Sequence, residues 1–486
     1  MGTEKMFRPG AVIYFVGIKG TGVCALAELM HNAGMKVSGS DIPEVFYTDV
    51  ILNELKIPFF QNFDASRITA DIDVVIHSPA YDNLNPELAR AAQLNIPILK
   101  YPDALGAWSA KFDSIGICGV HGKTTTTALA GVLMRAAGIP AQILTGSAAA
   151  DFGGRSTLIL GNKYFIAEAC EYREHFLSFH PKRIILTSVE SDHQDYFPDY
   201  ESIRDAFLKF CRMLPAGGEL IFCADDPGAS EVAQTIEKEN RGIVLVPYGF
   251  TANGDYKILS YNTQDKTASF SVAGLLAEQT QPAEFKLKIP GRHQALNATA
   301  ALALAKILTG NVLTNEQIEL MKTALEKFES SKRRSEVYGE AGGIIFMDDY
   351  GHHPTAIKTT LCGIKSFYPS RRLIVSFMSH TYTRTSALLD RFASAFSDAD
   401  ILFLHKIYSS ARENYSGRLN DKIFYDKTAQ MHSDVRYTDE PLDAFQPLCE
   451  TLKPGDIFLT MGAGNNWPLA EKLFAHYKSI DEQVIL

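Results

Sequence analysis

A glycine-rich segment, GVHGKTTTT at residues 119–127, has the residue types that bind nucleotide phosphates. It follows an apolar stretch typical of a buried strand and precedes a stretch typical of a helix, so backbone N–H groups would face a bound anion. Lys123 would neutralise the β and γ phosphates, and the Thr124 hydroxyl would bind Mg2+. The eight-residue form GxxxxGK[ST] needs glycine where the chain has Ile117, so the segment matches the shorter GxxGK form. The alternative is a tight strand-to-helix turn with a surface lysine.

Two later strand-like stretches in the same region end in residues that suit a metal site. Glu168 ends one of them and His193 follows the other. A carboxylate suits Mg2+, whereas imidazole does not, because this hard ion prefers oxygen ligands. Taken alone, His193 is an ordinary polar residue at a strand end. His193 becomes a better candidate for the metal site because the ends of parallel strands converge at one edge of the sheet.

A second glycine-rich turn, GIKGTG at residues 17–22, follows the first apolar stretch of the chain. Gly17, Gly20 and Gly22 would leave room for a diphosphate, and Asp41 ends the next strand as a candidate ribose or base contact. A packing turn would explain the same residues. Two phosphate loops in one chain suggest one nucleotide as fuel and another attached to the substrate.

The third group of polar residues lies in the last third of the chain. Its members are Asp348, Asp349, Tyr350, His352 and His353 after one apolar stretch, and His380 and Arg384 after the next. A guanidinium can hold a carboxylate through two parallel hydrogen bonds, as recognition of an amino acid requires. The alternative is a set of loop histidines with a surface arginine.

These polar residues recur after apolar stretches that alternate with helical patterns, which predicts α/β domains with parallel sheets. A chain of 486 residues suggests about three domains. We predict a Rossmann-like N-terminal domain at 1–113, a central P-loop ATPase-type α/β domain at 114–330, and a Rossmann-like C-terminal domain at 331–486.

Composition limits the partners and the compartment. A net charge of −9 gives no general attraction to nucleic acid or to an anionic membrane. The seven cysteines include no CxxC pair, which fits thiols in a reducing compartment and suggests no zinc site. No apolar run approaches the length needed to cross a bilayer. We therefore expect a cytoplasmic protein without nucleic-acid or membrane partners, either a monomer or a homodimer.

In this order the motifs resemble those of the Mur ligase family. The resemblance covers nearly the whole chain through FVGIKGTG, SGSD, CGVHGKTTTT, EACEYREHFL, ESDHQDYF, PGRHQALNATAA, DDYGHHPT, HTYTRT and MGAG. It implies ATP-driven amide bond formation in peptidoglycan precursor synthesis, with ATP and Mg2+ bound by the central domain. Within the family, the motifs are most similar to those of ligases that join L-alanine to UDP-N-acetylmuramate.

The resemblance also implies roles for individual residues. The UDP-sugar would contact Gly17, Gly20, Thr21, Gly22, Ser40, Asp41, His77 and Ser78. ATP would contact Gly119, Val120, His121, Gly122, Lys123, Thr124, Thr125, Gln294, Asn297, Arg333 and Arg334. The metal would bind Thr124, Glu168 and His193, and the amino acid would bind Tyr350, His352, His380 and Arg384. The catalytic residues would be Lys123, His193, His352, His380 and Arg384.

The implied reaction has two steps. The lactyl carboxylate of the sugar attacks the γ-phosphate to form an acyl phosphate, and the amine of alanine then displaces phosphate. Lys123 and the loop amides would stabilise the charge that moves onto ADP. No protein nucleophile is needed, and either His352 or His380 could assist loss of the amine proton.

The chain departs from the family pattern at four positions. Cys170 stands where aspartate is common, Ser188 where asparagine is common, Gln294 where asparagine is usual, and Asn465 where aspartate often follows GAG. Some relatives carry a carbamylated lysine near a second metal, and Lys209 is a candidate for that position.

Three alternative functions remain. The first is a recycling ligase that attaches an intact tripeptide to the same UDP-sugar; HTYTRT with its Arg384 favours a single small amino acid instead. The second is a nicotinamide-dependent oxidoreductase that uses GIKGTG, although this turn lacks the last glycine of GxGxxG. The third is a ligase fold that senses the UDP-sugar without catalysis.

Overall fold

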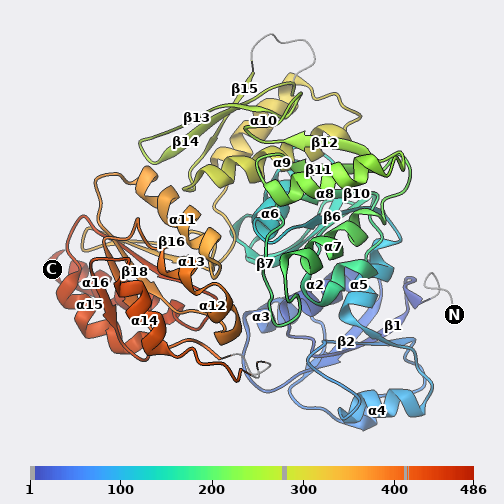
Figure 1. Cartoon of the computed structure of the whole chain (residues 1–486). Helices are drawn as coiled ribbons and strands as arrows, with labels where there is room; N and C mark the ends of the chain where they lie inside the picture. Colours follow the sequence, from blue (N-terminus) through green and yellow to red (C-terminus); the bar gives the residue numbers. More distant parts are fainter. Residues whose placement is uncertain (1–5, 276–281, 410–412, 414, 486) are drawn as a thin grey trace.

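The computed structural model describes residues 6–275, 282–409, 413 and 415–485, arranged as three α/β domains (Figure 1). In the first domain, β1 (Val12–Val16), β2 (Lys36–Ser40), β3 (Phe59–Phe60), β4 (Val74–His77) and β5 (Ile98–Lys100) form a parallel sheet in the order β3-β2-β1-β4-β5. Its helices are α2 (Thr21–Asn32), α3 (Tyr47–Glu54), α4 (Pro86–Gln93) and α5 (Tyr101–Ser109). The strand order reverses direction at β1, where ligands bind in open sheets of this kind.

The central domain contains a seven-stranded sheet in the order β12-β11-β10-β6-β9-β7-β8. Its strands are β6 (Asp113–Cys118), β7 (Ala141–Ala149), β8 (Arg155–Ile159), β9 (Tyr164–Glu168), β10 (Arg183–Leu186), β11 (Glu219–Cys223) and β12 (Val244–Tyr248). The edge strand β8 pairs antiparallel with β7, and the other pairings are parallel. The helices of this domain are α6 (Lys123–Ala137), α7 (Tyr200–Cys211), α8 (Pro227–Lys238), α9 (Arg292–Leu308) and α10 (Asn315–Glu326).

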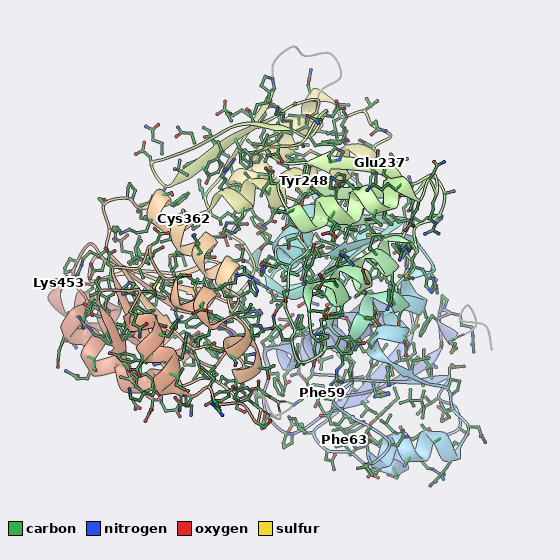
Figure 2. The ribbon with its side chains drawn as sticks, in the orientation of Figure 1. Phe59, Phe63, Glu237, Tyr248, Cys362 and Lys453 are labelled. Atoms are coloured by element: carbon green, nitrogen blue, oxygen red, sulfur yellow. The ribbon has the colours of Figure 1, made fainter. Side chains whose placement is uncertain are left out.

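An antiparallel sheet that the sequence did not predict extends the central domain. It consists of β13 (Ile258–Gln264), β14 (Thr267–Val272) and β15 (Ala283–Leu287). Phe270 and Phe285 stack from adjacent strands with their ring centroids 5.6 Å apart. Both belong to the same apolar core as Tyr248 at the end of β12, which Figure 2 labels. The small sheet therefore packs on the central domain and does not form a core of its own.

The C-terminal domain contains a six-stranded sheet in the order β16-β17-β21-β18-β19-β20. Its strands are β16 (Glu336–Ala341), β17 (Ile344–Asp349), β18 (Leu373–Phe377), β19 (Ile401–Leu404), β20 (Val435–Tyr437) and β21 (Ile457–Met461), and only β16 runs antiparallel to its neighbour. Its helices are α11 (Pro354–Phe367), α12 (Tyr382–Ala387), α13 (Leu389–Ala393), α14 (Asp421–Ala429), α15 (Phe445–Thr451) and α16 (Trp467–Ile485). The predicted three-domain α/β class is confirmed.

Charged residues join the first domain to the edge of the central sheet. Arg155 on β8 forms an ion pair with Glu28 of α2 and another, at 2.7 Å, with Glu54 of α3. Thr157 donates a hydrogen bond to Glu28 from the same strand. Because Glu28 is buried, these contacts fix the N-terminal domain against the central domain. Within the described part of the chain, no helix is long and apolar enough to span a membrane.

Candidate functional site

The loop between β6 and α6 depends on two glycines. Gly119 has φ +132°, and a Cβ there would lie 2.1 Å from Thr187 Oγ1. Gly122 has φ +82°, and a Cβ there would lie 2.7 Å from Asn297 Oδ1. Both positions therefore favour glycine on conformational and steric grounds. The loop also receives support from Ser188, which accepts hydrogen bonds from the backbone N–H groups of Val120 and His121.

Gly119→Ala should therefore weaken ATP binding about tenfold or more, since overpacking costs about 1–3 kcal/mol and the loop must shift. Calorimetric titration with MgATP measures this effect. Gly138→Ala is the control, because Gly138 also has positive φ but its Cβ would meet no atom within 4 Å. That variant should lose about 1 kcal/mol of unfolding free energy and keep its ATP affinity. Unchanged ATP affinity in Gly119→Ala would remove this loop from the nucleotide site.

Lys123 begins α6 and forms an ion pair with Glu171, with Nζ 2.8 Å from Oε2. Burial alone would lower the pKa of Lys123, but the charges of Glu171 and Glu168 outweigh it and raise the pKa to about 12. Glu171 also lies 3.3 Å from Nε2 of His193. A buried carboxylate therefore links the lysine of the loop to the histidine that follows β10.

Thr124 and Glu168, two of the predicted metal ligands, are in direct contact. Thr124 Oγ1 donates to Glu168 Oε2 at 2.8 Å, and the backbone N–H of Gly146 donates to the same oxygen at 2.9 Å. The Thr124 hydroxyl and the carboxylates of Glu168 and Glu171 supply the oxygen ligands that Mg2+ prefers. Together with the glycines that keep the loop open, this donor set fits a magnesium nucleotide. His193 joins the group through Glu171.

Helix α9 supplies the amide side chains predicted for the nucleotide. Asn297 accepts a hydrogen bond from Thr126 and donates one to Gln294 Oε1 at 3.1 Å. Both amides are buried, and Asn297 lies against Gly122 of the loop. Gln294 therefore has an orientation set by Asn297, and its remaining amide donors are available for a base.

The two candidate arginines differ in how they are held. Arg333 donates to Asp348 at 2.8 Å and to the carbonyl of Gly462 at 2.7 Å, which fixes it within the C-terminal domain. Arg334 lies with its guanidinium carbon 5.1 Å from the centroid of the Tyr350 ring. Of the two, Arg334 is the side chain better able to reach a phosphate.

The predicted amino-acid residues meet the central domain at the segment after β10. Arg384 of α12 donates through Nε to Asp192 Oδ1 at 2.7 Å, and its Nη1 donates to the carbonyl of His380. Both charged side chains are buried, and Asp192 Oδ2 lies 3.9 Å from His193 Nε2. Arg384 is therefore brought next to the residues around Lys123, although it comes from another domain.

Two histidines near Arg384 are held neutral. Burial, with the charge of Arg384, lowers the pKa of His352 well below its usual value, and the same causes lower the pKa of His380. His352 Nδ1 lies 3.0 Å from the carbonyl oxygen of Tyr350, and the His380 ring stacks on Tyr408. A neutral imidazole has a lone pair, so either ring can accept a proton.

In the first domain, the predicted turn packs tightly. A Cβ on Gly17 would lie 2.6 Å from the Tyr81 ring, and one on Gly22 would lie 2.6 Å from Tyr101 Oη. Asp41 accepts hydrogen bonds from the Lys19 backbone N–H at 2.7 Å and from Tyr81 Oη at 2.9 Å. Of the remaining predicted residues, Gly20 and Thr21 lie within this turn, Ser40 and His77 end β2 and β4, and Ser78 follows β4.

Some of these side chains already have protein partners. The buried Ser40 hydroxyl donates to Glu87, and His77 Nδ1 lies 3.0 Å from the carbonyl of Ser78. Ser78 Oγ accepts from the backbone N–H of Ala80 at 3.3 Å. The turn itself is shaped by the Asp41 carboxylate and by the backbone carbonyl of Ser40, which accepts from the N–H groups of Gly17 and Ile18.

Sequence reasoning assigned no role to three acidic residues that hold this site together, namely Glu171, Glu190 and Asp192. Each stands within a motif that the sequence displays, EACE or VESDHQD. Their type and position were visible, but their partners come from other segments. Apart from Asp192 and His193, which are adjacent in sequence, the paired residues are separated by 22 residues, for Glu171 and His193, to 201 residues, for Glu190 and Arg391.

Family models match all three domains: the Mur ligase family catalytic domain at 12–113, the Mur ligase middle domain at 117–305, and the Mur ligase glutamate ligase domain at 333–464. A protein of Treponema pallidum named UDP-N-acetylmuramate--L-alanine ligase is 48% identical over 98% of this chain and 99% of its own. This chain belongs to the Mur ligase family. A ligase of Borreliella burgdorferi with the same name is 39% identical over 95% of this chain and 98% of its own.

Solved structures of Mur ligases have the same fold. The UDP-N-acetylmuramate-alanine ligase of Thermotoga maritima superposes with a TM-score of 0.75 at 25% identity, covering 96% of this chain and 99% of its own. A murein peptide ligase of Psychrobacter arcticus superposes with a TM-score of 0.63 at 21% identity, with the same coverage. At that identity the second match supports the fold alone.

The departures from the Mur ligase pattern have distinct surroundings. Ser188 supports the loop between β6 and α6, and Gln294 is oriented by Asn297. Cys170 and Asn465 are exposed. Lys209, the candidate for carbamylation, has a half-exposed side chain and donates to Glu174 at 2.7 Å.

Proposed function

We propose that this chain is an ATP-dependent ligase that joins L-alanine to the lactyl carboxylate of UDP-N-acetylmuramate. The observation that carries the proposal is the buried pair between Arg384 and Asp192. Asp192 lies 3.9 Å from His193, and His193 lies 3.3 Å from Glu171, the partner of Lys123. This chain of contacts connects a carboxylate-binding guanidinium to the loop lysine, so an amino acid and a phosphate can meet. The names of the full-length relatives support the same substrates.

In the first step, residues around the loop bind and orient ATP against the sugar carboxylate. The loop amides and Lys123 hold the β and γ phosphates and stabilise charge as it moves to ADP. Of the predicted metal ligands, Thr124 and Glu168 would hold Mg2+ directly. The carboxylate of Glu171 would take the place of the predicted His193, which contacts Glu171 and whose imidazole suits Mg2+ poorly. When bound, the ion supplies positive charge to the phosphate oxygens. The product of this step is an acyl phosphate, in which phosphate is a good leaving group.

In the second step, Arg384 orients alanine by its carboxylate. Five N–H groups are available on a guanidinium, and the contacts to Asp192 and His380 use two of them. The remaining N–H groups can bind a carboxylate through a pair of hydrogen bonds. The neutral amine then attacks the acyl phosphate, phosphate leaves, and His352 or His380 accepts the amine proton.

The contacts between the domains support protection of the acyl phosphate from water. Residues 190–192 contact the C-terminal domain through Arg391, His353 and Arg384. Such a closed arrangement excludes solvent from a reactive intermediate. The proposal includes a cytoplasmic location, where the seven free cysteines stay reduced.

Paired substrates test the proposal and its rivals. We expect phosphate release from ATP only when UDP-N-acetylmuramate and L-alanine are both present. Release with the tripeptide and not with L-alanine would identify the recycling ligase. Binding of the UDP-sugar without any turnover would identify a sensor, and NAD binding with no need for ATP would identify an oxidoreductase. Glycine and L-serine in place of L-alanine measure the strictness of the amino-acid site.

A further inference from the structure

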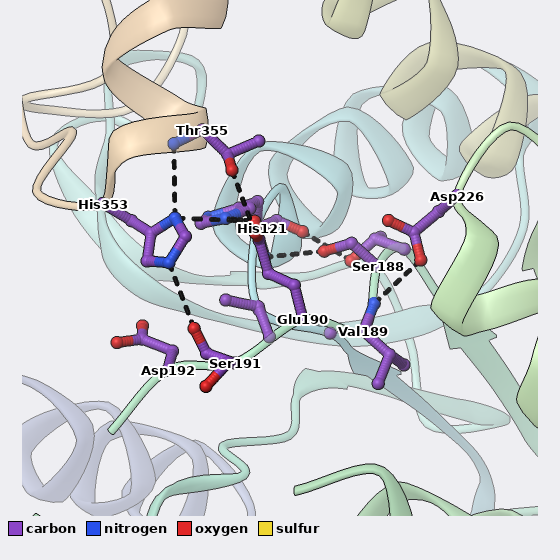
Figure 3. Close-up of polar contacts among 12 residues, drawn as sticks. His121, Ser188, Val189, Glu190, Ser191, Asp192, Asp226, His353 and Thr355 are labelled. Atoms are coloured by element: carbon purple, nitrogen blue, oxygen red, sulfur yellow. Dashed lines mark hydrogen bonds and ion pairs between the residues drawn. The ribbon is translucent and has the colours of Figure 1, made fainter. Parts of the chain in front are cut away.

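A cluster of His121, Glu190 and His353 lies where the phosphate loop meets the C-terminal domain (Figure 3). One ligand atom from each residue lies within 4.8 Å of the other two. His121 belongs to the loop, Glu190 to the segment after β10, and His353 to the start of α11. The three side chains therefore converge from three separate segments and two domains. None of the roles described above uses this convergence.

Hydrogen bonds orient His353 as metal-binding histidines are oriented. Its Nε2 lies 3.1 Å from the carbonyl of Ser191, so Nε2 carries the proton and Nδ1 has the lone pair. Nδ1 accepts a long hydrogen bond, at 3.3 Å, from the backbone N–H of Thr355 at the start of α11, and it lies 3.5 Å from Glu190 Oε1. Metal-ligating histidines commonly donate their other ring N–H to a carbonyl in this way. A cation between Nδ1 and Oε1 would replace the Thr355 N–H as the partner of the Nδ1 lone pair.

Hydrogen bonds to the Oε2 atom of Glu190 hold its carboxylate in place. Oε2 accepts hydrogen bonds from Thr355 Oγ1 at 2.9 Å and from Arg391 at 3.0 Å. Oε1 remains directed toward the two imidazoles, and it accepts a close hydrogen bond from His121 Nε2. These outer contacts set the orientation that a ligating carboxylate requires.

We propose that His121, Glu190 and His353 bind a divalent transition-metal ion of the zinc type. Two imidazole nitrogens and one carboxylate oxygen suit Zn2+ or Co2+, whereas Mg2+ prefers oxygen ligands alone. This site is separate from the magnesium site at Thr124 and Glu168. Three protein ligands leave one tetrahedral position for water.

Binding requires a small adjustment of the cluster. His121 Nε2 and Glu190 Oε1 are in direct hydrogen-bond contact, whereas two ligands of a tetrahedral zinc ion stand about 3.3 Å apart. A slight rotation of the His121 side chain, whose exposed fraction is 26%, provides this separation. The cation then takes the place of the proton between the two groups.

A bound cation would join the two domains. Two of its ligands come from the central domain and one from the C-terminal domain, so it binds only when these domains are in contact. By mass action it stabilises that closed arrangement. Zinc should then slow the opening that releases products, but the binding site itself does not depend on which substrates the ligase uses.

Zinc titration of the full-length protein in excess Mg2+ tests the site. His353→Gln should bind the ion at this site at least tenfold more weakly than the wild type. His432→Gln is the matched control, because His432 also lies within hydrogen-bond distance of a carbonyl through Nε2, at 2.8 Å, and accepts a backbone N–H through Nδ1. Its zinc affinity should equal that of the wild type. Equal zinc affinity in all three proteins would overturn the proposal.

Anomalous scattering from zinc-soaked crystals of the wild type gives a test that needs no variant. The proposal requires a peak within about 2.0–2.2 Å of His121, His353 and Glu190 ligand atoms. Co2+ bound there should show visible absorption without the thiolate charge-transfer bands that cysteine ligands cause. A zinc peak at other residues, or thiolate bands with no peak at this cluster, would reject the site.

Discussion

Lys123→Ala is expected to lower kcat by on the order of 10³-fold or more, while affinity for UDP-N-acetylmuramate stays within about twofold of the wild type. Lys123 lies at the loop, and its charge acts on the phosphate as charge moves to ADP. An interaction that strengthens in the transition state lowers kcat when it is lost. Single-turnover phosphate release and calorimetric titration of the UDP-sugar measure the two quantities.

The same substitution has a structural cost that must be separated from the catalytic one. It leaves the buried Glu171 without its lysine partner, and breaking a buried ion pair costs about 3 kcal/mol of unfolding free energy. Glu171→Gln added to Lys123→Ala removes the unpaired charge, so the double variant should recover stability. It should not recover turnover. Glu171→Gln alone is the reference, because both it and the double variant lack the carboxylate proposed for Mg2+. Equal turnover in these two variants would show that Lys123 acts only through folding.

The strand, loop and helix from β6 to α6 were the part of the candidate site whose local structure the sequence predicted best. Its residues are contiguous, so the strand, the glycines and the helix that position Lys123 could be read together. Glu168 was also predictable, because a carboxylate at a strand end of a parallel sheet lies near a loop from the adjacent strand. In the structure β9 pairs with β6, which brings Glu168 to Thr124.

Contacts between domains were beyond the reach of sequence patterns. Asp192 and Glu190 stand in a visible motif, but their partners Arg384 and Arg391 are 192 and 201 residues away. Periodicity and turn residues describe local structure and do not specify how two domains meet. His121 shows the same limit: its place in the loop was predicted, but its contact with Glu190 depends on the end of another strand.

The small antiparallel sheet was missed for a different reason. Its strand β13 has one buried residue at its start and is otherwise mostly exposed or half-buried, so it lacks a strong apolar pattern. The pairing of β13 with β14 buries Phe270 against the central core. A strand whose stability comes from tertiary packing gives a weak signal in the sequence.

Arg384→Ala is expected to raise the KM for L-alanine by about 10- to 100-fold, with a smaller change in kcat. A charged hydrogen-bonded pair contributes about 1.5–3 kcal/mol, and the alanine carboxylate would lose such a pair. The KM for ATP should stay near that of the wild type. Arg384 belongs to the C-terminal domain, which we propose binds the amino acid, whereas the candidate ATP loop belongs to the central domain. Initial rates over a range of alanine concentrations measure the change.

Two matched variants separate recognition from the loss of a buried charge. Arg384→Lys keeps a positive charge but lacks the planar fork, so it should also raise the alanine KM. Asp192→Asn keeps the size of its side chain and removes the charge that orients Arg384, so it should raise the alanine KM by less than Arg384→Ala does. Unchanged alanine kinetics in Arg384→Ala would remove this residue from the substrate site. If only the KM for ATP rose, the Arg384–Asp192 pair would instead serve to hold the two domains together. In that case its loss would disturb the ATP site and leave alanine recognition unchanged.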